Sequence, residues 1–122
     1  MVASDNKQQI TYQGNVKIYH LDNTMLADTL VADMANDADK IFTARGKKVS
    51  IVNTVDKINA SAEQIVYYPD RKYIELSGDA EFISPQQQVR GDYVKYYLQS
   101  GKLEVKNQQG KKRKPMITID NL

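Results

Sequence analysis

The sequence predicts an all-β fold built from stacked repeats, on three observations. First, apolar and polar residues alternate around a central glycine in Ile10–Ile18, and the pattern returns in Phe42–Ile51 and in Ile74–Phe82. Second, these glycines stand at positions 14, 46 and 78, so the repeat period is 32 residues. Third, turn-forming residues separate short β-rich runs about every 8 to 12 positions, and no long helical periodicity is visible. Repeats of this length cannot bury an apolar face alone and must stack.

The first repeat follows a polar stretch, residues 1–9. Its central glycine indicates a bulge or a bend within a strand pattern. Asp22-Asn23 is the expected turn after it. The spacing of Met25–Ala32 fits a helix or a strand, and we interpret it as a strand because it takes an equivalent place in a β repeat.

The second and third repeats are bounded by turn signals. Asn36–Asp39 is rich in turn formers and predicts a loop before the run Lys40–Val52. Pro69-Asp70 predicts a hairpin between the runs Ile58–Tyr67 and Tyr73–Ile83.

The last predicted strands are Tyr93–Leu98, Leu103–Val105 and Met116–Ile119. Residues 115–122 are expected to form the C-terminal edge strand. The fourth repeat, around Gly110, is degenerate. Its apolar residues lie an odd number of positions from the glycine, whereas those of the other repeats lie an even number away. We therefore expect this repeat to form the cap at one end of the stack.

A small residue followed by an acid recurs in the second half of each repeat, as Ala27-Asp28, Ala62-Glu63 and Gly91-Asp92. We expect these pairs to mark corners where the chain bends sharply. Carboxylates can also hold a metal ion or act as a catalytic pair, but equivalent positions in each repeat favour repeated corner hydrogen bonds.

Length and composition describe a single globular domain, residues 1–122, with 41% hydrophobic and 26% charged residues. No apolar run approaches the ~18 residues of a membrane span, so no transmembrane segment is expected. Cysteine is absent, which excludes disulfide frameworks, thiolate zinc sites and cysteine nucleophiles.

Positive charge is concentrated near the C-terminus. Lys106 and Lys111–Lys114 supply five of the 17 basic residues, and the remaining 12 face 15 acids in a slightly acidic body. The run can be a solvated loop that guards an edge strand, or it can contact phosphates or an anionic membrane. We favour the loop, and we expect no nucleic-acid partner because one short run supplies the charge.

Catalysis is not expected. His20 is the single histidine, and no sequence pattern of a nucleophile and its base surrounds it. The chain is therefore predicted not to be an enzyme, to hold no metal and to need no cofactor.

Several sequence motifs, taken together and in order, resemble the LptA/OstA-like family of lipopolysaccharide transport proteins from the periplasm of Gram-negative bacteria. These motifs are Leu26–Asp28, Ala62–Tyr67, Tyr73–Ala80 and Val89–Val94, together with the repeated alternating pattern around a central glycine. The resemblance covers residues 10 to 119, nearly the whole chain.

The resemblance implies a twisted, open β-jelly roll of short antiparallel strands whose apolar interior holds lipid acyl chains. It also implies the periplasm as the location, with any export signal outside these residues. The implied partners are lipopolysaccharide and the β-jelly-roll domains of LptC and LptD, which stack edge to edge into a bridge to the outer membrane.

The inward-facing apolar residues are the candidate lipid contacts, and by motif the family's contact positions fall on Ile51 and Tyr67. Without the resemblance, the same residues are expected to form a closed core. The predicted lipid-binding residues are Val16, Ile18, Phe42, Val49, Ile51, Ile65, Tyr67, Leu76, Phe82, Val94 and Tyr96.

The family usually begins with an extra strand, and here that N-terminal edge, residues 1–9, looks shortened. Nine positions separate Asp5 from Gly14, against 15 from Glu63 to Gly78. Self-association is therefore expected to be weakened. The predicted partner-edge residues are Ile10, Tyr12, Met116, Ile117, Thr118 and Ile119.

Two alternatives remain open on the sequence. A structural β-solenoid or adhesin-type repeat would also show a period of 32 residues, and it would form uniform parallel coils. An LptC-type or LptD-type domain would keep the same jelly-roll fold.

Overall fold

The chain folds into one nine-stranded sheet in the computed structural model, which describes residues 2–6, 8–20, 22–106 and 116–119. The strands are β1 (Val2–Asn6), β2 (Gln9–His20), β3 (Asn23–Asp33), β4 (Ile41–Asn53), β5 (Ile58–Tyr68), β6 (Tyr73–Ile83), β7 (Gln87–Tyr97), β8 (Leu103–Lys106) and β9 (Met116–Ile119).

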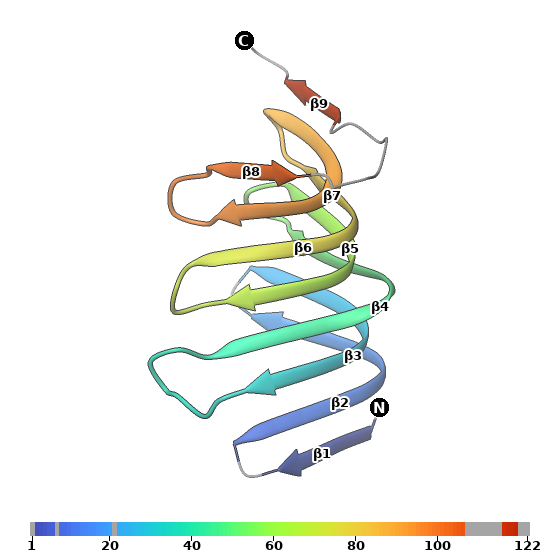
Figure 1. Ribbon diagram of the computed structural model, residues 1–122, viewed down its shortest axis with the longest axis vertical. Helices are drawn as coiled ribbons and strands as arrows, with labels where there is room; N and C mark the ends of the chain where they lie inside the picture. Colours follow the sequence, from blue (N-terminus) through green and yellow to red (C-terminus); the bar gives the residue numbers. More distant parts are fainter. Residues whose placement is uncertain (1, 7, 21, 107–115, 120–122) are drawn as a thin grey trace.

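The strand order follows the chain from β1 to β8, with β9 added beside β7 (Figure 1). Every described pair of strands is antiparallel. The predicted all-β fold is therefore confirmed, and the antiparallel pairing rules out the uniform parallel coils of a solenoid. The described residues contain no helix that could cross a membrane.

Each long strand, β2 to β7, bends in the middle and contributes to two layers. Pairing registers shift at the bend in every neighbouring pair from β2/β3 to β6/β7. The first layer contains β1, residues 9–13, 29–33, 41–45, 64–68, 73–77 and 93–97, and β8; the second contains residues 16–20, 23–27, 49–53, 58–62, 80–83 and 87–91, and β9. Figure 1 shows the bends at the right-hand side.

Glycine makes the bend possible in the first and third repeats. Gly14 and Asn15 have φ of 84° and 47°, and Gly78 and Asp79 have φ of 81° and 47°. Two successive left-handed residues form a β-bulge, and the first position strongly favours a residue without a Cβ. The bulge turns the strand without ending it.

The second repeat bends differently, because Gly46, Lys47 and Lys48 all lie between the paired residues Arg45 and Val49. Gly46 is not left-handed, but a Cβ there would lie 2.7 Å from Oδ2 of Asp28. That carboxylate oxygen accepts a hydrogen bond of 3.3 Å from the backbone N–H of Lys47. The predicted role of Asp28 at a corner is thus confirmed.

The strands are longer than the short ones that the sequence suggested, since β2 to β7 have 11 to 13 residues. The sequence suggested shorter strands because the residues around each glycine are typical of turns. In the structure these residues form a bulge inside one strand and not a turn between two strands. The expected strand at Met25–Ala32, the hairpin at Pro69-Asp70 and the loop at Asn36–Asp39 all lie where the sequence placed them.

The N-terminal edge differs from the expectation. Ile10 pairs with Asp5 and Tyr12 with Ala3, so these two predicted edge residues lie one strand inside the sheet. The reason is that residues 2–6 form β1. Being short, β1 covers only the first half of β2, and residues 16–20 have no described strand on their outer side.

The C-terminal edge consists of two separate strands. β8 pairs with residues 93–96 of β7, and β9 pairs with residues 87–90. The predicted strand Met116–Ile119 is present and has β7 as its one described neighbour. Residues 115 and 120–122, also predicted in this edge, and the basic run Lys111–Lys114 lie outside the described residues.

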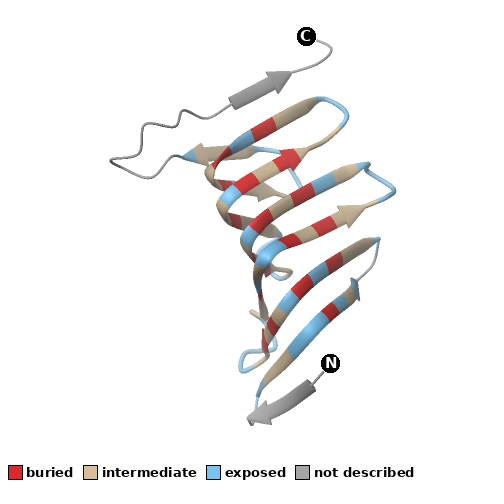
Figure 2. Cartoon of the chain, turned by 90° about the vertical axis from the view of Figure 1, so that its right-hand side faces the viewer, coloured by how far each residue is buried: buried red, intermediate tan, exposed pale blue. Residues whose placement is uncertain are grey.

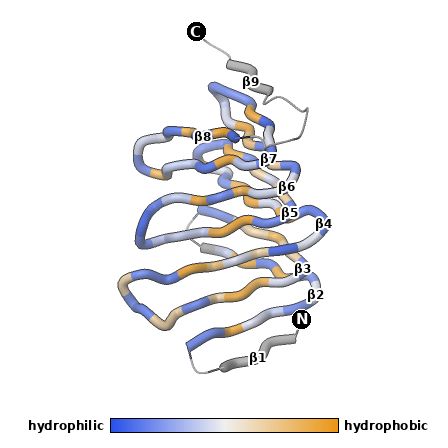
Figure 3. Tube along the Cα trace, viewed as in Figure 1, coloured by the Kyte–Doolittle hydropathy of each residue, from blue (hydrophilic) through white to orange (hydrophobic). Residues whose placement is uncertain are grey.

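The core lies between the layers and is apolar (Figures 2 and 3). The alternation changes phase at each bend, as in β5, where Ala60 and Ala62 are buried before it and Ile65 and Tyr67 after it. No polar or charged side chain is buried among the described residues. Hydrophobic burial is therefore the main force that holds the layers together.

Replacing Gly78 by alanine is expected to cost more stability than replacing Gly14. Both positions are left-handed, so a Cβ costs about 1 kcal/mol in backbone strain at each. At Gly78 the new Cβ would also lie 3.0 Å from Cβ of Glu63, whereas nothing lies within 4 Å at Gly14. We expect G78A to lose about 2 to 3 kcal/mol of unfolding free energy in urea. Equal losses in the two variants would contradict this packing role of the corner.

Candidate functional site

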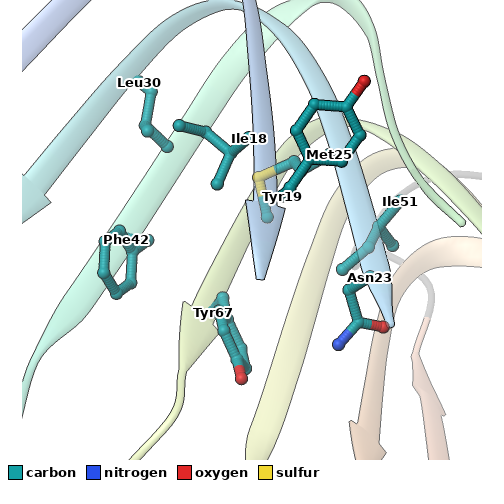
Figure 4. Close-up of a pocket in the computed structure, with 8 residues that line it drawn as sticks. All are labelled: Ile18, Tyr19, Asn23, Met25, Leu30, Phe42, Ile51 and Tyr67. Carbon is teal, nitrogen blue, oxygen red and sulfur yellow. The ribbon is translucent and has the colours of Figure 1, made fainter. Parts of the chain in front are cut away.

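The two layers meet at the bends and stay open on the opposite side, where hairpins form the rim. A hollow of about 200 Å³ opens there near the N-terminal end of the sheet (Figure 4). It is lined by Ile18, Tyr19, Asn23, Met25, Leu30, Phe42, Ile51 and Tyr67. The rings of Phe42 and Tyr67, paired across β4 and β5, stack with centroids 6.1 Å apart.

Two further hollows continue this opening toward the C-terminal end. The second, of about 200 Å³, shares Asn23, Ile51 and Tyr67 with the first. The third, of about 380 Å³, shares Asp56, Ile58, Tyr96 and Leu98 with the second. Because neighbouring hollows share lining residues, they lie side by side along the open side, and together we call them the groove.

The predicted lipid-binding residues divide into two groups. Six line the groove: Ile18, Phe42, Ile51, Tyr67, Phe82 and Tyr96. The other five line none of the three hollows and lie in the core, with exposed fractions as low as that of Phe82: Val16, Val49, Ile65, Leu76 and Val94.

Distance from the bend decides which group a residue joins. Val49 lies next to the bulge and is fully buried, whereas Ile51, two positions further along the same face, lines the groove. Ile65 and Tyr67 repeat this relation in β5. Residues at the bend therefore fill the closed corner, and residues near the hairpins face the opening.

Sequence reasoning missed several lining residues, among them Met25, Leu30, Ile58 and Leu98. Met25 and Leu30 are on opposite sides of the bend in β3, so they share an inward face despite an odd spacing. The small residue and acid at Ala27-Asp28 indicated a corner. At such a corner the alternation of inward and outward side chains changes phase, and this change was the signal that could have identified Met25 and Leu30.

Tyr19 also lines the first hollow, although the alternation of apolar and polar residues along β2 would direct its side chain outward. Its side chain is 68% exposed. It lies near the end of β2, in the half that has no described strand beyond it. An aromatic ring at such an edge is free to fold over the rim.

Burial raises the pKa of Tyr67, with a further contribution from the charge of Asp70. Burial likewise raises the pKa of Tyr96, and the charge of Asp56 adds to it. Both phenols are therefore neutral at physiological pH. They offer the groove hydrogen-bonding groups without charge.

Other tyrosines stabilise the outer surface of the first layer. Tyr68 stacks on Tyr73 at 4.5 Å between ring centroids, and Tyr73 lies 5.9 Å from Tyr97, each pair being directly opposite across adjacent strands. Nζ of Lys95 lies 4.2 Å from the centroid of Tyr73. Burial and a hydrogen bond with Glu75 raise the pKa of Tyr68 to about 12. This arrangement is a set of cross-strand pairs, away from the groove.

Within the described part of the chain, no three histidine or acidic side chains are placed to hold a metal ion. The groove instead offers an apolar surface with a few neutral polar groups. Such a surface suits an extended hydrocarbon ligand.

Comparison with known proteins gives one family and one fold. A family model described as "LptA/(LptD N-terminal domain) LPS transport protein" matches residues 1–113. No curated protein sequence matches the chain. Among solved structures, LptH from Pseudomonas aeruginosa is similar with a TM-score of 0.87 and 16% identity, over 98% of this chain and 91% of that one. It is described as the LptA homologous periplasmic component of the conserved lipopolysaccharide transport device. At this identity the likeness shows the shared β-jelly-roll fold.

The division between corner and groove residues predicts different costs of truncation. Leu76→Ala is expected to cost about 3 kcal/mol of unfolding free energy, because it opens a cavity in the closed corner. Ile18→Ala is expected to cost about 1 kcal/mol, because its side chain already borders the open groove. Urea unfolding of the two variants beside the unmodified protein measures both values. A loss for Ile18→Ala as large as that for Leu76→Ala would show that the groove is closed in solution.

Proposed function

The chain belongs to the LptA/LptD N-terminal domain family of lipopolysaccharide transport proteins, and on this premise we propose that it carries lipopolysaccharide with the acyl chains in the groove. The observation that carries the proposal is the row of adjacent hollows between two layers that are open along one side. Family membership makes it a transport protein and not an enzyme.

The energy available from such a groove suits a carrier. Each buried methylene contributes about 0.8 kcal/mol, so a chain of about twelve carbons gains roughly 9 kcal/mol. Ordering of the ligand and its lost freedom of movement reduce this gain substantially. The remaining affinity is moderate, which favours transfer to the next protein over permanent retention.

The open side also supports transfer along the molecule. A guest in an open groove keeps the part of its head group that projects from the open side in water, while its chains lie between the layers. Because the hollows share residues such as Ile51 and Tyr67, hydrocarbon can slide from one to the next.

Stacked domains would extend this groove beyond one molecule. We propose that β9 and β8 pair with the N-terminal edge of a neighbouring β-jelly roll, of LptC or LptD type, and that the assembly lies in the periplasm and leads to the outer membrane. Unpaired strand edges are ready templates for such addition. We expect self-association to be weaker at the other end, where β1 pairs with only half of β2 among the described residues.

Photo-crosslinking tests the groove. A photoreactive residue in place of Ile51 or Tyr67 is expected to capture lipopolysaccharide, because both side chains line two of the hollows. Lys48, exposed at the bend on the far side of the roll, is the matched control. The labelled fraction is measured on gels and by mass spectrometry. Equal labelling at positions 48 and 51 would exclude the groove as the site.

Amide hydrogen exchange tests the edge. A purified LptC-type or LptD-type jelly-roll domain that pairs with β9 is expected to slow exchange at Met116–Ile119, because amides on the outer side of that strand gain partners. Amides in β5, which has a strand on each side, are expected to exchange as before. No protection at β9 with either domain would rule out docking through this edge.

A further inference from the structure

The groove changes in chemistry from one end to the other. In the first hollow, Asn23 is the one polar residue apart from two tyrosines, and the remaining lining residues are apolar. The third hollow has five serine or glutamine residues in its lining: Ser84, Gln86, Gln87, Gln99 and Ser100. A ligand that is apolar at one end and polar at the other therefore matches the groove in one direction only.

Asp56 is the one charged side chain that lines these three hollows, and it borders the second and the third. It lies in the β4–β5 hairpin, where its backbone N–H donates a 2.8 Å hydrogen bond to Oδ1 of Asn53. None of the described ion pairs involves Asp56. Its negative charge therefore acts on whatever enters this part of the groove.

Nearby lysines do not neutralise the site within the described residues. Lys57 follows Asp56 but does not line the hollows. Lys102, in the hairpin opposite, has its ammonium 3.7 Å from Glu104 and 5.8 Å from the ring of Tyr97. Among the described residues, the polar end of the groove thus has a carboxylate and no facing cation.

The amides in the third hollow are available to a ligand. Among the described residues, the side chains of Gln86, Gln87 and Gln99 have no hydrogen-bond partner, and they line the same hollow as Ser84. Amides and hydroxyls both donate and accept hydrogen bonds, as sugar hydroxyls do. An anion would meet the same amides but would be repelled by Asp56.

We propose that the third hollow is a subsite for a neutral, hydroxyl-bearing sugar, and that it orients an amphiphile with its hydrocarbon tail toward β2 and β3 and its sugar toward β6 and β7. Asp56 is the residue that sets this specificity, because it disfavours a phosphate at this place. From β2 to β7 the groove crosses about 24 Å at the usual strand spacing, which accommodates an extended single-chain lipid. The inference rests on the proposed function, since it describes how the same groove distinguishes the two ends of its ligand.

Two detergents with the same tail test this specificity, both used below their micelle-forming concentrations. n-Dodecyl β-maltoside has a neutral sugar head, and dodecyl phosphate has an anionic head. We expect the unmodified protein to bind the maltoside at least threefold more tightly by calorimetry, and D56N to bind dodecyl phosphate about threefold to tenfold more tightly than the unmodified protein. Raising the salt concentration is expected to shrink the second difference. D37N removes an exposed charge outside the three hollows and is expected to leave both affinities unchanged.

Photoreactive residues at positions 19 and 86 test the orientation with dodecyl maltoside, since these positions line the first and the third hollow. Mass spectrometry is expected to find the tail attached at 19 and the sugar at 86. The reverse pattern, the same part of the detergent at both positions, or an unchanged preference in D56N would overturn the inference while leaving the groove as a carrier. If the unmodified protein bound neither detergent, the proposed function would fail with it.

Discussion

The bend within each long strand is the constraint on which the rest of the structure depends. A bulge at Gly14 or Gly78 lets one strand leave the first layer and enter the second without a break in pairing. The two layers are therefore halves of the same strands, joined at one side and separate at the other. A sandwich of independent sheets could close on both sides, whereas this fold closes only at the bends.

The groove follows directly from this geometry. Small side chains such as Ala27 and Ala62 are buried beside the bend, where the layers approach each other. Larger residues such as Phe42 and Tyr67 lie toward the hairpins, where the layers diverge. A stable core and an accessible apolar surface thus share one continuous interior, and the position along each strand decides which of the two a residue serves.

Sequence patterns predicted the fold class, the repeat, the corners and the inward face, because each depends on short-range chemistry. Alternation tells which side of the sheet a residue faces, but it does not tell how deep the residue lies. Val49 and Ile51 are equivalent in pattern, yet only Ile51 reaches the groove. Depth depends on the angle between layers, which is a tertiary property. The position of Ile10 and Tyr12 could not be predicted either, because it required knowing that the short polar segment before them pairs as β1.

The sequential strand order has a consequence for how the molecule folds and opens. In the described part of the chain, each strand pairs only with its neighbours in the sheet, and apart from β9 these are its neighbours along the chain. Such a chain behaves as a one-dimensional array, in which stability accumulates pair by pair and pairing can spread from any hairpin. Opening then starts at the two ends, where β1 and β9 each have a single described neighbour. The segments with the lowest local stability are therefore those best placed to exchange partners, while β4, β5 and β6 hold the interior in register.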